Sequence, residues 1–384
     1  MRIPVAGSAV RTGLALLLLA AGTTACGSKA GAPGAVEQPP AAAAPRQARS
    51  FTVVASGDVL LHNTIYEQAR KGSGYDFRRV FAGAAGVVGD ADLAVCHVES
   101  PFGAPGGPFS NYPNFSAPPQ VADTLKAIGY DTCSVSSNHV LDTGVKGVVR
   151  TLDKLDAVGI RHAGAARSAA EAKRVNLLEV RGAKVAQLSY SYGFNGKLRP
   201  KDKPWLANLI DAAAIRAEAK RARDAGAEVV IASLHWGQEY RHKPLPEQSG
   251  LAAQLLADPN VDLIIGHHAH VVQPFAKVNG KWVAYGLGNQ IADQFKLNKP
   301  VTQQNVYARF TFTDPGTGRW AVTKAEFIPM VIDRGPYRVV NLGRAVKDSG
   351  RSATQLRKYR RDLEAVRQVV LSLGADRDGL VVGD

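Results

Sequence analysis

The sequence predicts an α/β protein, because short apolar runs alternate with amphipathic helical segments along most of its 384 residues. Several apolar runs end in Asp, Glu, Asn or His, and two late runs follow one another without a helix between them. With 45% hydrophobic and 21% charged residues, the chain has the composition of a globular protein with a sizeable core.

The elements are expected in the following order. The segment 118–130 starts with prolines and stops at Gly129, which are helix signals. Asn279 and Gly280 predict a tight hairpin turn within 275–288. Strands are expected at 50–62, 91–100, 131–139, 184–193, 228–237, 261–270, 305–313 and 320–332, the last two as an antiparallel pair, and helices at 118–130, 144–160, 211–227, 245–260 and 351–374.

The first 25 residues have the pattern of a secretory signal peptide. Arg2 and Arg11 precede an apolar run that ends at Leu19, and small residues lead to Cys26. A membrane-spanning helix needs ~20 apolar residues, and this run is shorter. The stretch "TTAC" resembles a bacterial lipobox that lacks the usual leucine, so we expect Cys26 to be lipidated and to anchor the protein outside the bacterial membrane. Cleavage near Ala25 would instead release a secreted protein.

Composition divides the remaining chain into three parts. Residues 26–49 are rich in Ala, Pro and Gly, with almost no bulky apolar residues, and are expected to form a disordered tether. The globular domain is expected at 50–335. A C-terminal extension, 336–384, contains the basic amphipathic helix.

The chain is basic, with a formal net charge of +14, or +12 once Arg2 and Arg11 are removed. A basic exported protein suits an anionic envelope polymer or a lipid surface as partner. Aromatic residues are not interleaved with the positive charge, which argues against nucleic-acid binding. Cys96 and Cys133 lie in apolar strand-like runs, so buried free thiols are expected rather than a disulfide.

Metal-competent side chains recur where apolar strands end. Any one of them is accounted for by a cap or a turn, but five strand ends indicate a common site, because ligands bind at the carboxyl ends of strands in open α/β sheets. The mixed oxygen and nitrogen donors suit two divalent transition ions, Mn, Fe or Zn. The residues are Asp58, Glu99, Asn138, His139, His235, His268 and His270.

The stretch "LIIGHHAHVVQP", residues 263–274, places three histidines in four positions after an apolar run. In an extended chain, residues i and i+2 point to the same side. We therefore expect His268 and His270 to face one ion and His267 to point away.

The order of the motifs resembles that of the bacterial capsule-synthesis CapA family, which is named for poly-γ-glutamate capsule production and is related to calcineurin-like metallophosphoesterases. The resemblance covers about residues 51–335 and implies a metallophosphoesterase-like α/β/β/α sandwich with mixed sheets. It rests on "GD" (57–58), "VES" (98–100), "SNHVLDTG" (137–144), "LHWGQEY" (234–240), "GHHAHVVQP" (266–274) and "YGLGNQIADQ" (285–294).

The resemblance implies a role for each site residue. Asp58 and His270 would hold the first metal, and Glu99 would bridge the two metals. The second metal would take Asn138, His235 and His268. His139 resembles the histidine that protonates the leaving oxygen in phosphoesterases, and Asp142 either orients His139 or caps the helix that follows.

Two positions depart from the phosphoesterase pattern. These enzymes usually carry Asp-x-His, whereas Asp58 is followed by Val59 and Leu60, and the nearest histidine is His62. Glu99 stands where Asp is usual. The first metal is therefore short of one ligand unless His62 replaces it.

Two functions from different classes are compatible with these observations. The first is a metal-dependent hydrolase that cleaves a phosphoester or a related bond in an envelope polymer, with water attacking at a dinuclear centre. The second is a non-catalytic accessory that binds or anchors an anionic, poly-γ-glutamate-like polymer during export. Convergence of the predicted ligands favours the hydrolase, and a disrupted first-metal site favours the accessory.

Overall fold

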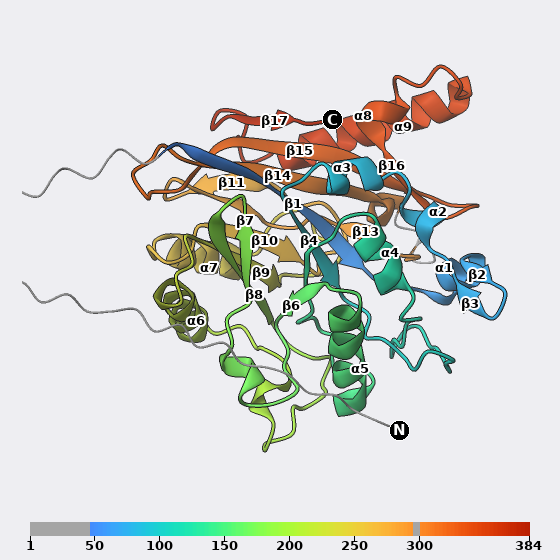
Figure 1. Ribbon diagram of the computed structural model, residues 1–384. Helices are drawn as coiled ribbons and strands as arrows, with labels where there is room; N and C mark the ends of the chain where they lie inside the picture. The colour runs from blue at the N-terminus through green and yellow to red at the C-terminus, as the bar shows by residue number, and fades with distance from the viewer. Residues whose placement is uncertain (1–46, 295–299) are drawn as a thin grey trace, which may run out of the picture. The chain divides into compact units, whose positions relative to one another are not determined.

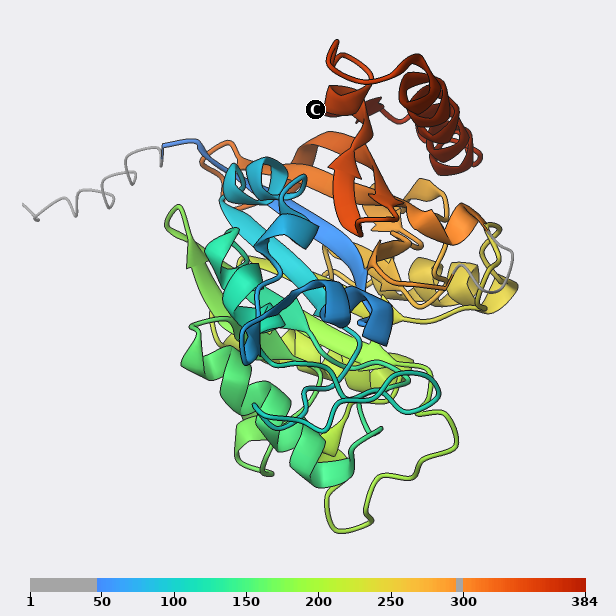
Figure 2. The same cartoon turned by 90° about the vertical axis from the view of Figure 1, so that its right-hand side faces the viewer.

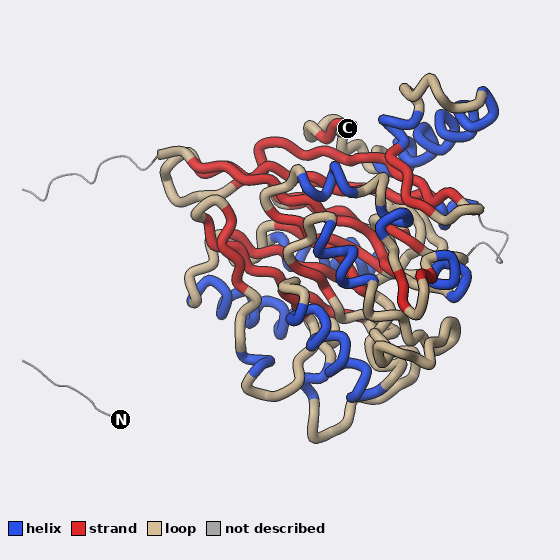
Figure 3. Tube along the Cα trace, turned by 45° about the vertical axis from the view of Figure 1, so that its right-hand side comes forward, coloured by secondary structure: helices blue, strands red, loops and turns tan. Residues whose placement is uncertain are grey.

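The computed structural model describes residues 47–294 and 300–384. In this part of the chain two β-sheets pack face to face, and helices cover their outer faces (Figure 1). Figure 3 shows the strands gathered in the interior with helices around them. This arrangement confirms the predicted α/β/β/α sandwich with mixed sheets.

The larger sheet has nine strands and is mixed. Its strands β1, β4, β5 and β6 pair in parallel, so their carboxyl ends lie along one edge, whereas β14, β15 and β16 add antiparallel strands. Along the sheet the order is β16 (Arg338–Asn341), β15 (Ala321–Asp333), β14 (Gln304–Asp314), β1 (Arg49–Val59), β4 (Leu93–Val98), β5 (Thr132–Ser134) and β6 (Arg161–Ala163), with β13 (Asn289–Ile291) beside β1 and β17 (Leu380–Val382) beside β15.

The smaller sheet has six strands, of which the four central ones run parallel. Its antiparallel hairpin turns at Asn279 and Gly280, whose φ angles of 50° and 77° confirm the predicted tight turn. The order is β11 (Phe275–Val278), β12 (Lys281–Ala284), β10 (Leu263–His267), β9 (Val229–His235), β8 (Ala183–Ser191) and β7 (Leu177–Val180), and a separate hairpin joins β2 (Arg70–Lys71) to β3 (Gly74–Tyr75).

The helices cover the two outer faces. Helices α1 to α5 pack on the larger sheet, and α6 and α7 pack on the smaller one. The bounds are α1 (Asn63–Gln68), α2 (Arg78–Phe81), α3 (Ala85–Gly89), α4 (Val121–Ala127), α5 (Gly144–Ala157), α6 (Ala212–Asp224), α7 (Pro246–Leu256), α8 (Leu342–Ala345) and α9 (Ala353–Val370), with the 3₁₀ turns η1 (Glu171–Lys173), η2 (Pro204–Leu206) and η4 (Pro300–Gln303).

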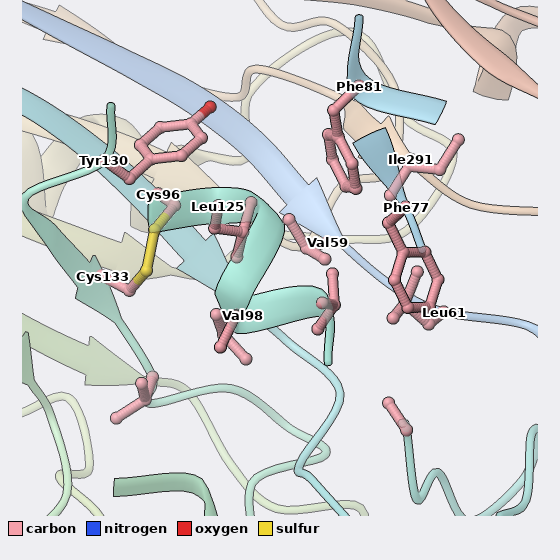
Figure 4. Close-up of a cluster of buried hydrophobic side chains, with 14 of the residues drawn as sticks. Val59, Leu61, Phe77, Phe81, Cys96, Val98, Leu125, Tyr130, Cys133 and Ile291 are labelled. Atoms are coloured by element: carbon pink, nitrogen blue, oxygen red, sulfur yellow. A yellow bond between two sulfur atoms is a disulfide. The ribbon is translucent and has the colours of Figure 1, made fainter. Parts of the chain in front are cut away.

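Strand β1 shows how the layers are built. Alternate side chains of a strand point to opposite faces of its sheet. Val53 therefore joins the core between the two sheets, and its neighbour Val54 joins the core under the helices. Figure 4 shows part of the core under the helices, where Val59, the last residue of β1, and Leu61, two residues later, lie near Phe77.

Cys96 and Cys133 form a disulfide (Figure 4), so the expectation of free thiols is wrong. The two residues are register partners on the parallel strands β4 and β5, with Cα atoms 4.4 Å apart. That distance lies within the range of disulfides. The register between strands, which the local sequence does not reveal, decides the outcome.

The predicted C-terminal extension is part of the larger sheet. Strands β16 and β17 both pair with β15. Helix α9, dark red in Figure 2, packs beside the sheet, where Val366 and Val370 join the core that contains residues of β14 and β15. Residues 338–382 therefore contribute to the same core as the rest of the domain.

The predicted signal peptide, Cys26 and nearly all of the predicted tether lie outside the described residues, and β1 begins at Arg49. Among the residues that the structure describes, we find no helix with the length and apolarity needed to cross a bilayer.

Candidate metal centre

The ends of strands from both sheets meet at one polar cluster. In the larger sheet, Asp58 of β1 is the register partner of His97 on β4 and of Asn289 on β13. In the smaller sheet, His235 of β9 pairs with His267 of β10. Hydrogen bonds between His97 and His235 and between His267 and Asp58 join the two sheets at this edge.

Asp58, Glu99 and His270 form a buried group whose ligand atoms lie within 4.8 Å of one another. The distance between Nε2 of His270 and Oε1 of Glu99 is 3.7 Å, and that between Nδ1 of His270 and Oδ2 of Asp58 is 3.3 Å. These are the three residues predicted around the first metal. The structure brings them together, and their role as ligands stays a prediction.

The predicted ligands of the second metal adjoin this group. Nε2 of His235 lies 2.9 Å from Oδ1 of Asn138 and 3.8 Å from Oε1 of Glu99. Oε1 of Glu99 therefore lies within 4 Å of ring nitrogens of both His235 and His270. The bridging role of Glu99 stays a prediction.

The carboxylate of Glu99 is the feature of the cluster that best fits a cation. The residue is fully buried, and neither of its oxygens has a hydrogen-bond partner. Burial raises the pKa of Glu99 well above its ordinary value. Burial of an ionised carboxylate is costly unless a partner charge or a metal compensates it. The residues present therefore fit a bound divalent cation.

Asp58 is held in place by its neighbours. It accepts hydrogen bonds from Nδ1 of His267 at 3.2 Å and from the backbone N–H of His268 at 3.2 Å. Burial alone raises its pKa, but the hydrogen bonds from His267 and His270 outweigh burial and hold the pKa well below the ordinary value. The two carboxylates of the centre thus differ, because only Asp58 has protein donors.

The histidine stretch departs from the expected geometry. Strand β10 ends at His267, and the next residues turn, with φ of 88° at His268 and 56° at His270. The argument from alternation therefore fails, although the rings of His268 and His270 do lie together, with centroids 6.0 Å apart. His267 does not point away from the cluster, because its ring stacks on His97 and bonds Asp58.

His97 belongs to the cluster and was missed by the sequence analysis. Its Nε2 lies 3.0 Å from Nδ1 of His235, and its Nδ1 lies 2.8 Å from Oγ of Ser134. Burial lowers the pKa of both histidines well below the ordinary value, so both imidazoles are neutral, as metal ligands must be. His97 lies on strand β4 two residues before Glu99, which directly follows the strand, and this spacing is visible in the sequence.

His139 lies at the edge of the centre and is oriented by Asp142. Its Nδ1 donates to Oδ2 of Asp142 at 2.7 Å, and its ring meets Phe115 edge to face at 4.7 Å between centroids. Asp142 does not cap helix α5, whose N-cap is Thr143 with no side-chain cap bond. Of the two alternatives for Asp142, the contact with His139 is therefore the one present.

A cavity of about 460 Å³ opens beside the centre. His139 and His270 line it, as does His62, whose Nδ1 accepts a hydrogen bond from the backbone N–H of Asp293 at 3.1 Å. Burial lowers the pKa of His62 to about 4. His62 is in none of the metal-competent groups found among the described residues, and its role as a replacement ligand stays a prediction. Of the residues described, no lysine or arginine lines the cavity.

Comparison with known proteins identifies a family. The model of the family described as "Bacterial capsule synthesis protein PGA_cap" matches residues 52–294. The capsule biosynthesis protein CapA of Bacillus anthracis is 27% identical over 64% of this chain and 57% of its own length. The PGA biosynthesis protein CapA of Bacillus subtilis (strain 168) is 31% identical over 52% of this chain and 51% of its own length. The matches span little more than half of these relatives.

Among solved structures, the calcineurin-like phosphoesterase YfkN of Bacillus subtilis is similar to this chain with a TM-score of 0.44 and 15% sequence identity. The similarity covers 83% of this chain and 99% of that one.

Proposed function

Because the chain belongs to the bacterial capsule synthesis protein PGA_cap family, we propose that it is an exported, metal-dependent hydrolase of capsule or cell-envelope polymer synthesis. It acts on a phosphoester or a related bond at a dinuclear centre. The observation that carries the proposal is the buried, unpartnered carboxylate of Glu99 between the ring nitrogens of His235 and His270.

The donor set determines which ions fit. Asp58, Glu99 and His270 would supply two carboxylates and an imidazole to the first position. Glu99, Asn138, His235 and His268 would supply the second. Mixed oxygen and imidazole donors suit Mn, Fe or Zn. When bound, divalent ions at such a centre act as Lewis acids toward a phosphoryl oxygen and orient the groups that react.

Protein side chains supply the remaining chemistry. His139 donates a proton to the leaving oxygen, because it lines the cavity beside the centre. The Asp142 carboxylate accepts from its Nδ1–H, which leaves Nε2 as the nitrogen that carries the transferred proton. Phe115 packs against the ring and fixes its plane.

The cavity wall favours a neutral leaving group. It combines the apolar side chains of Leu60 and Phe115 with the exposed ring of Tyr112 and the amides of Asn63 and Asn111. The described lining contains the acidic residues Glu239 and Asp293 and no lysine or arginine, so apart from His270 and a bound metal it offers no positive charge to a carboxylate-rich segment.

The test is hydrolysis of an aryl phosphate and an aryl phosphodiester by protein loaded with Mn²⁺, Fe²⁺ or Zn²⁺. We expect slow hydrolysis that a chelator abolishes. His235→Ala removes a ligand, so metal and activity should be lost together. A fully loaded wild-type protein that cleaves no phosphoester in either class contradicts the hydrolase proposal.

Export and anchoring belong to the same proposal. The disulfide between Cys96 and Cys133 supports an oxidising compartment outside the cytoplasm. We propose that Cys26, at the end of the lipobox-like stretch "TTAC", carries the lipid. Two or more acyl chains on it would hold the protein stably on a membrane. Cys26→Ser should release the protein into the medium, and a variant that stays membrane-bound to the same degree contradicts the lipid anchor.

A specific observation also supports the second candidate, a polymer-binding accessory. Helix α9 exposes Arg357, Arg360 and Arg361 on the surface of the domain. The accessory function predicts that metal-free protein binds poly-γ-glutamate, and that Arg360→Glu combined with Arg361→Glu weakens binding. If the protein binds the polymer but the metal-loaded protein hydrolyses neither the aryl phosphate nor the aryl phosphodiester, the accessory is the better description.

A further inference from the structure

One more carboxylate approaches the centre, from the side of the cavity. The ligand atoms of Glu239, His268 and His270 lie within 4.8 Å of one another. Glu239 lies in the loop that follows β9, and neither the strand-end pattern nor the resemblance assigned it a role. It is more exposed than the two histidines, which are buried.

The β1 segment adds no donor after Asp58 to the first metal position. Val59, Leu60 and Leu61 follow Asp58, and all three are buried apolar side chains. Asp58, Glu99 and His270 make three protein donors, so a further coordination position is open to water or to another side chain.

The two histidines present nitrogens that a ligand would satisfy. Nδ1 of His268 is buried and has no hydrogen-bond partner. In His270, Nδ1 lies 2.9 Å from Oδ1 of Asn289, which leaves Nε2 for an ion. A buried imidazole nitrogen without a hydrogen-bond partner, in a group with a carboxylate, is an arrangement that a cation stabilises.

The loops that follow β9 and β10 both adopt an unfavourable backbone conformation beside Glu239 and His268. Tyr240, His268 and His270 have φ angles of 62°, 88° and 56°, in the left-handed region that non-glycine residues rarely adopt. Residues held in such conformations are destabilising and cluster at ligand sites. The backbone N–H of Tyr240 donates to the carbonyl of Ala269 at 2.7 Å, which ties the two loops together.

We infer that Glu239 is a ligand of a divalent transition-metal ion, which it holds together with His268 and His270. The inference rests on the proposed metal centre and adds a donor to it. Glu239 lines two hollows, the cavity that contains His139 and a neighbouring one that contains His268. Its carboxylate thus adds a donor from the cavity side of the centre, whereas Glu99 is fully buried.

The test compares Glu239→Gln and Glu239→Ala with Glu247→Gln. Glu247 is an exposed residue of helix α7 outside the cluster, so it controls for the loss of one negative charge. Chelator-treated protein is titrated with Mn²⁺ and with Zn²⁺ by calorimetry, and the bound metal is counted by elemental analysis. We expect both Glu239 variants to lose at least ~10-fold in affinity or to bind fewer ions, since even outer-shell changes cost 10–100-fold, while Glu247→Gln binds as the wild type does.

The visible absorption of bound Co²⁺ gives a readout of the coordination itself. Loss of a carboxylate ligand should change the spectrum in Glu239→Gln and leave it unchanged in Glu247→Gln. Wild-type affinity, stoichiometry and spectrum in both Glu239 variants, together with metal loss in Asp58→Ala, would overturn the inference and leave the proposed centre standing. Absence of metal binding in the wild type would overturn both.

Discussion

Two clusters of histidine and carboxylates in this molecule have similar composition and different surroundings. The first is the centre at the strand ends, with Asp58, Glu99 and His270. The second lies at the edge of the larger sheet, where Asp156 of α5, His162 of β6 and Glu171 of η1 hold their ligand atoms within 4.8 Å of one another. Ligand type and spacing alone do not separate them.

The surrounding charges separate them. In the second cluster Arg167 bonds Asp153 and Asp156, each at 2.6 Å, and it also bonds Glu171. The side chain of Asp156 is 47% exposed, so water solvates it as well. In the first cluster Glu99 is fully buried, its carboxylate has no hydrogen-bond partner, and the only basic groups within 4 Å of it among the described residues are the imidazoles of His235 and His270.

The difference shows what a candidate metal site needs beyond its residues. An arginine already compensates the carboxylates at the sheet edge, so a cation there would have to displace it. At the strand ends the Glu99 carboxylate has no hydrogen-bond donor and no arginine or lysine partner in the part of the chain that the structure describes, and the basic groups beside it are the imidazoles of His235 and His270. The predictions below test this distinction, from the largest expected effect to the smallest.

Glu99→Gln should abolish metal binding, because it removes the carboxylate shared by both predicted positions. Glu171→Gln is the matched change in the second cluster and should leave the metal content at the wild-type level. Elemental analysis of the purified variants checks both. Equal metal content in the two variants would remove the distinction between the clusters.

His139→Ala should lower the rate of phosphoester hydrolysis by on the order of 10²–10⁴ and leave the metal in place, since the residue supplies a proton rather than a ligand bond. His162→Ala in the second cluster should change neither quantity. Steady-state kinetics and metal analysis on the same preparations provide the measurement. If His139→Ala empties the centre, the histidine is a ligand and the assignment as acid is wrong.

Replacing Cys96 and Cys133 by alanine should lower the free energy of unfolding by roughly 2–4 kcal/mol. The disulfide closes a loop with a sequence separation of 37 and joins the two strands beneath the first cluster. No such crosslink supports the second cluster in the part of the chain described. Denaturant titration measures the change, and reduced wild-type protein should match the variant if the bond itself is responsible.

His267→Ala should weaken metal binding by ~10–100-fold, as expected for a residue that acts through a ligand. Its Nδ1 holds Asp58 in position, whereas His270 is predicted to bind the metal directly. His270→Ala should therefore cost more. Calorimetric titration compares the two, and equal losses would contradict the view that His267 is not itself a ligand.

Arg167→Ala should cost about 1 kcal/mol in the free energy of unfolding, since its ion pairs are largely solvated. The change also leaves Asp156, His162 and Glu171 without a compensating charge, so weak Zn²⁺ binding should become measurable there. A thermal melt and a zinc titration test both effects. If zinc does not bind to the variant, compensation by the arginine is not what distinguishes the second cluster.

Local sequence patterns predicted most of the regular elements. The apolar run before Gly266, the helix signals around Gly129 and the turn at Asn279 and Gly280 each correspond to the element expected. These patterns work because apolar periodicity and turn chemistry act over a few neighbouring residues. Short elements such as β6 and β17, which pack at sheet edges, have no such pattern and were not predicted.

Within the centre, the sequence pointed to Asp58, Glu99 and His270, because each follows an apolar strand, and the structure brings the three together. It did not predict that His97 would contact His235, because this contact joins strands of two different sheets. It also led to the wrong geometry at His268, where the chain turns instead of continuing as a strand.

The sequence by itself determined which chemistry is available: the order of the strands and helices, and the acids, amide and imidazoles that end the strands. The tertiary structure alone decided which of these groups lack a partner. Strand register paired Cys96 with Cys133. Packing left Glu99 without a hydrogen-bond donor, whereas in the second cluster Arg167 compensates Asp156 and Glu171. The reason is physical: periodicity is a local property of the chain, whereas register, burial and charge compensation depend on residues far apart in sequence.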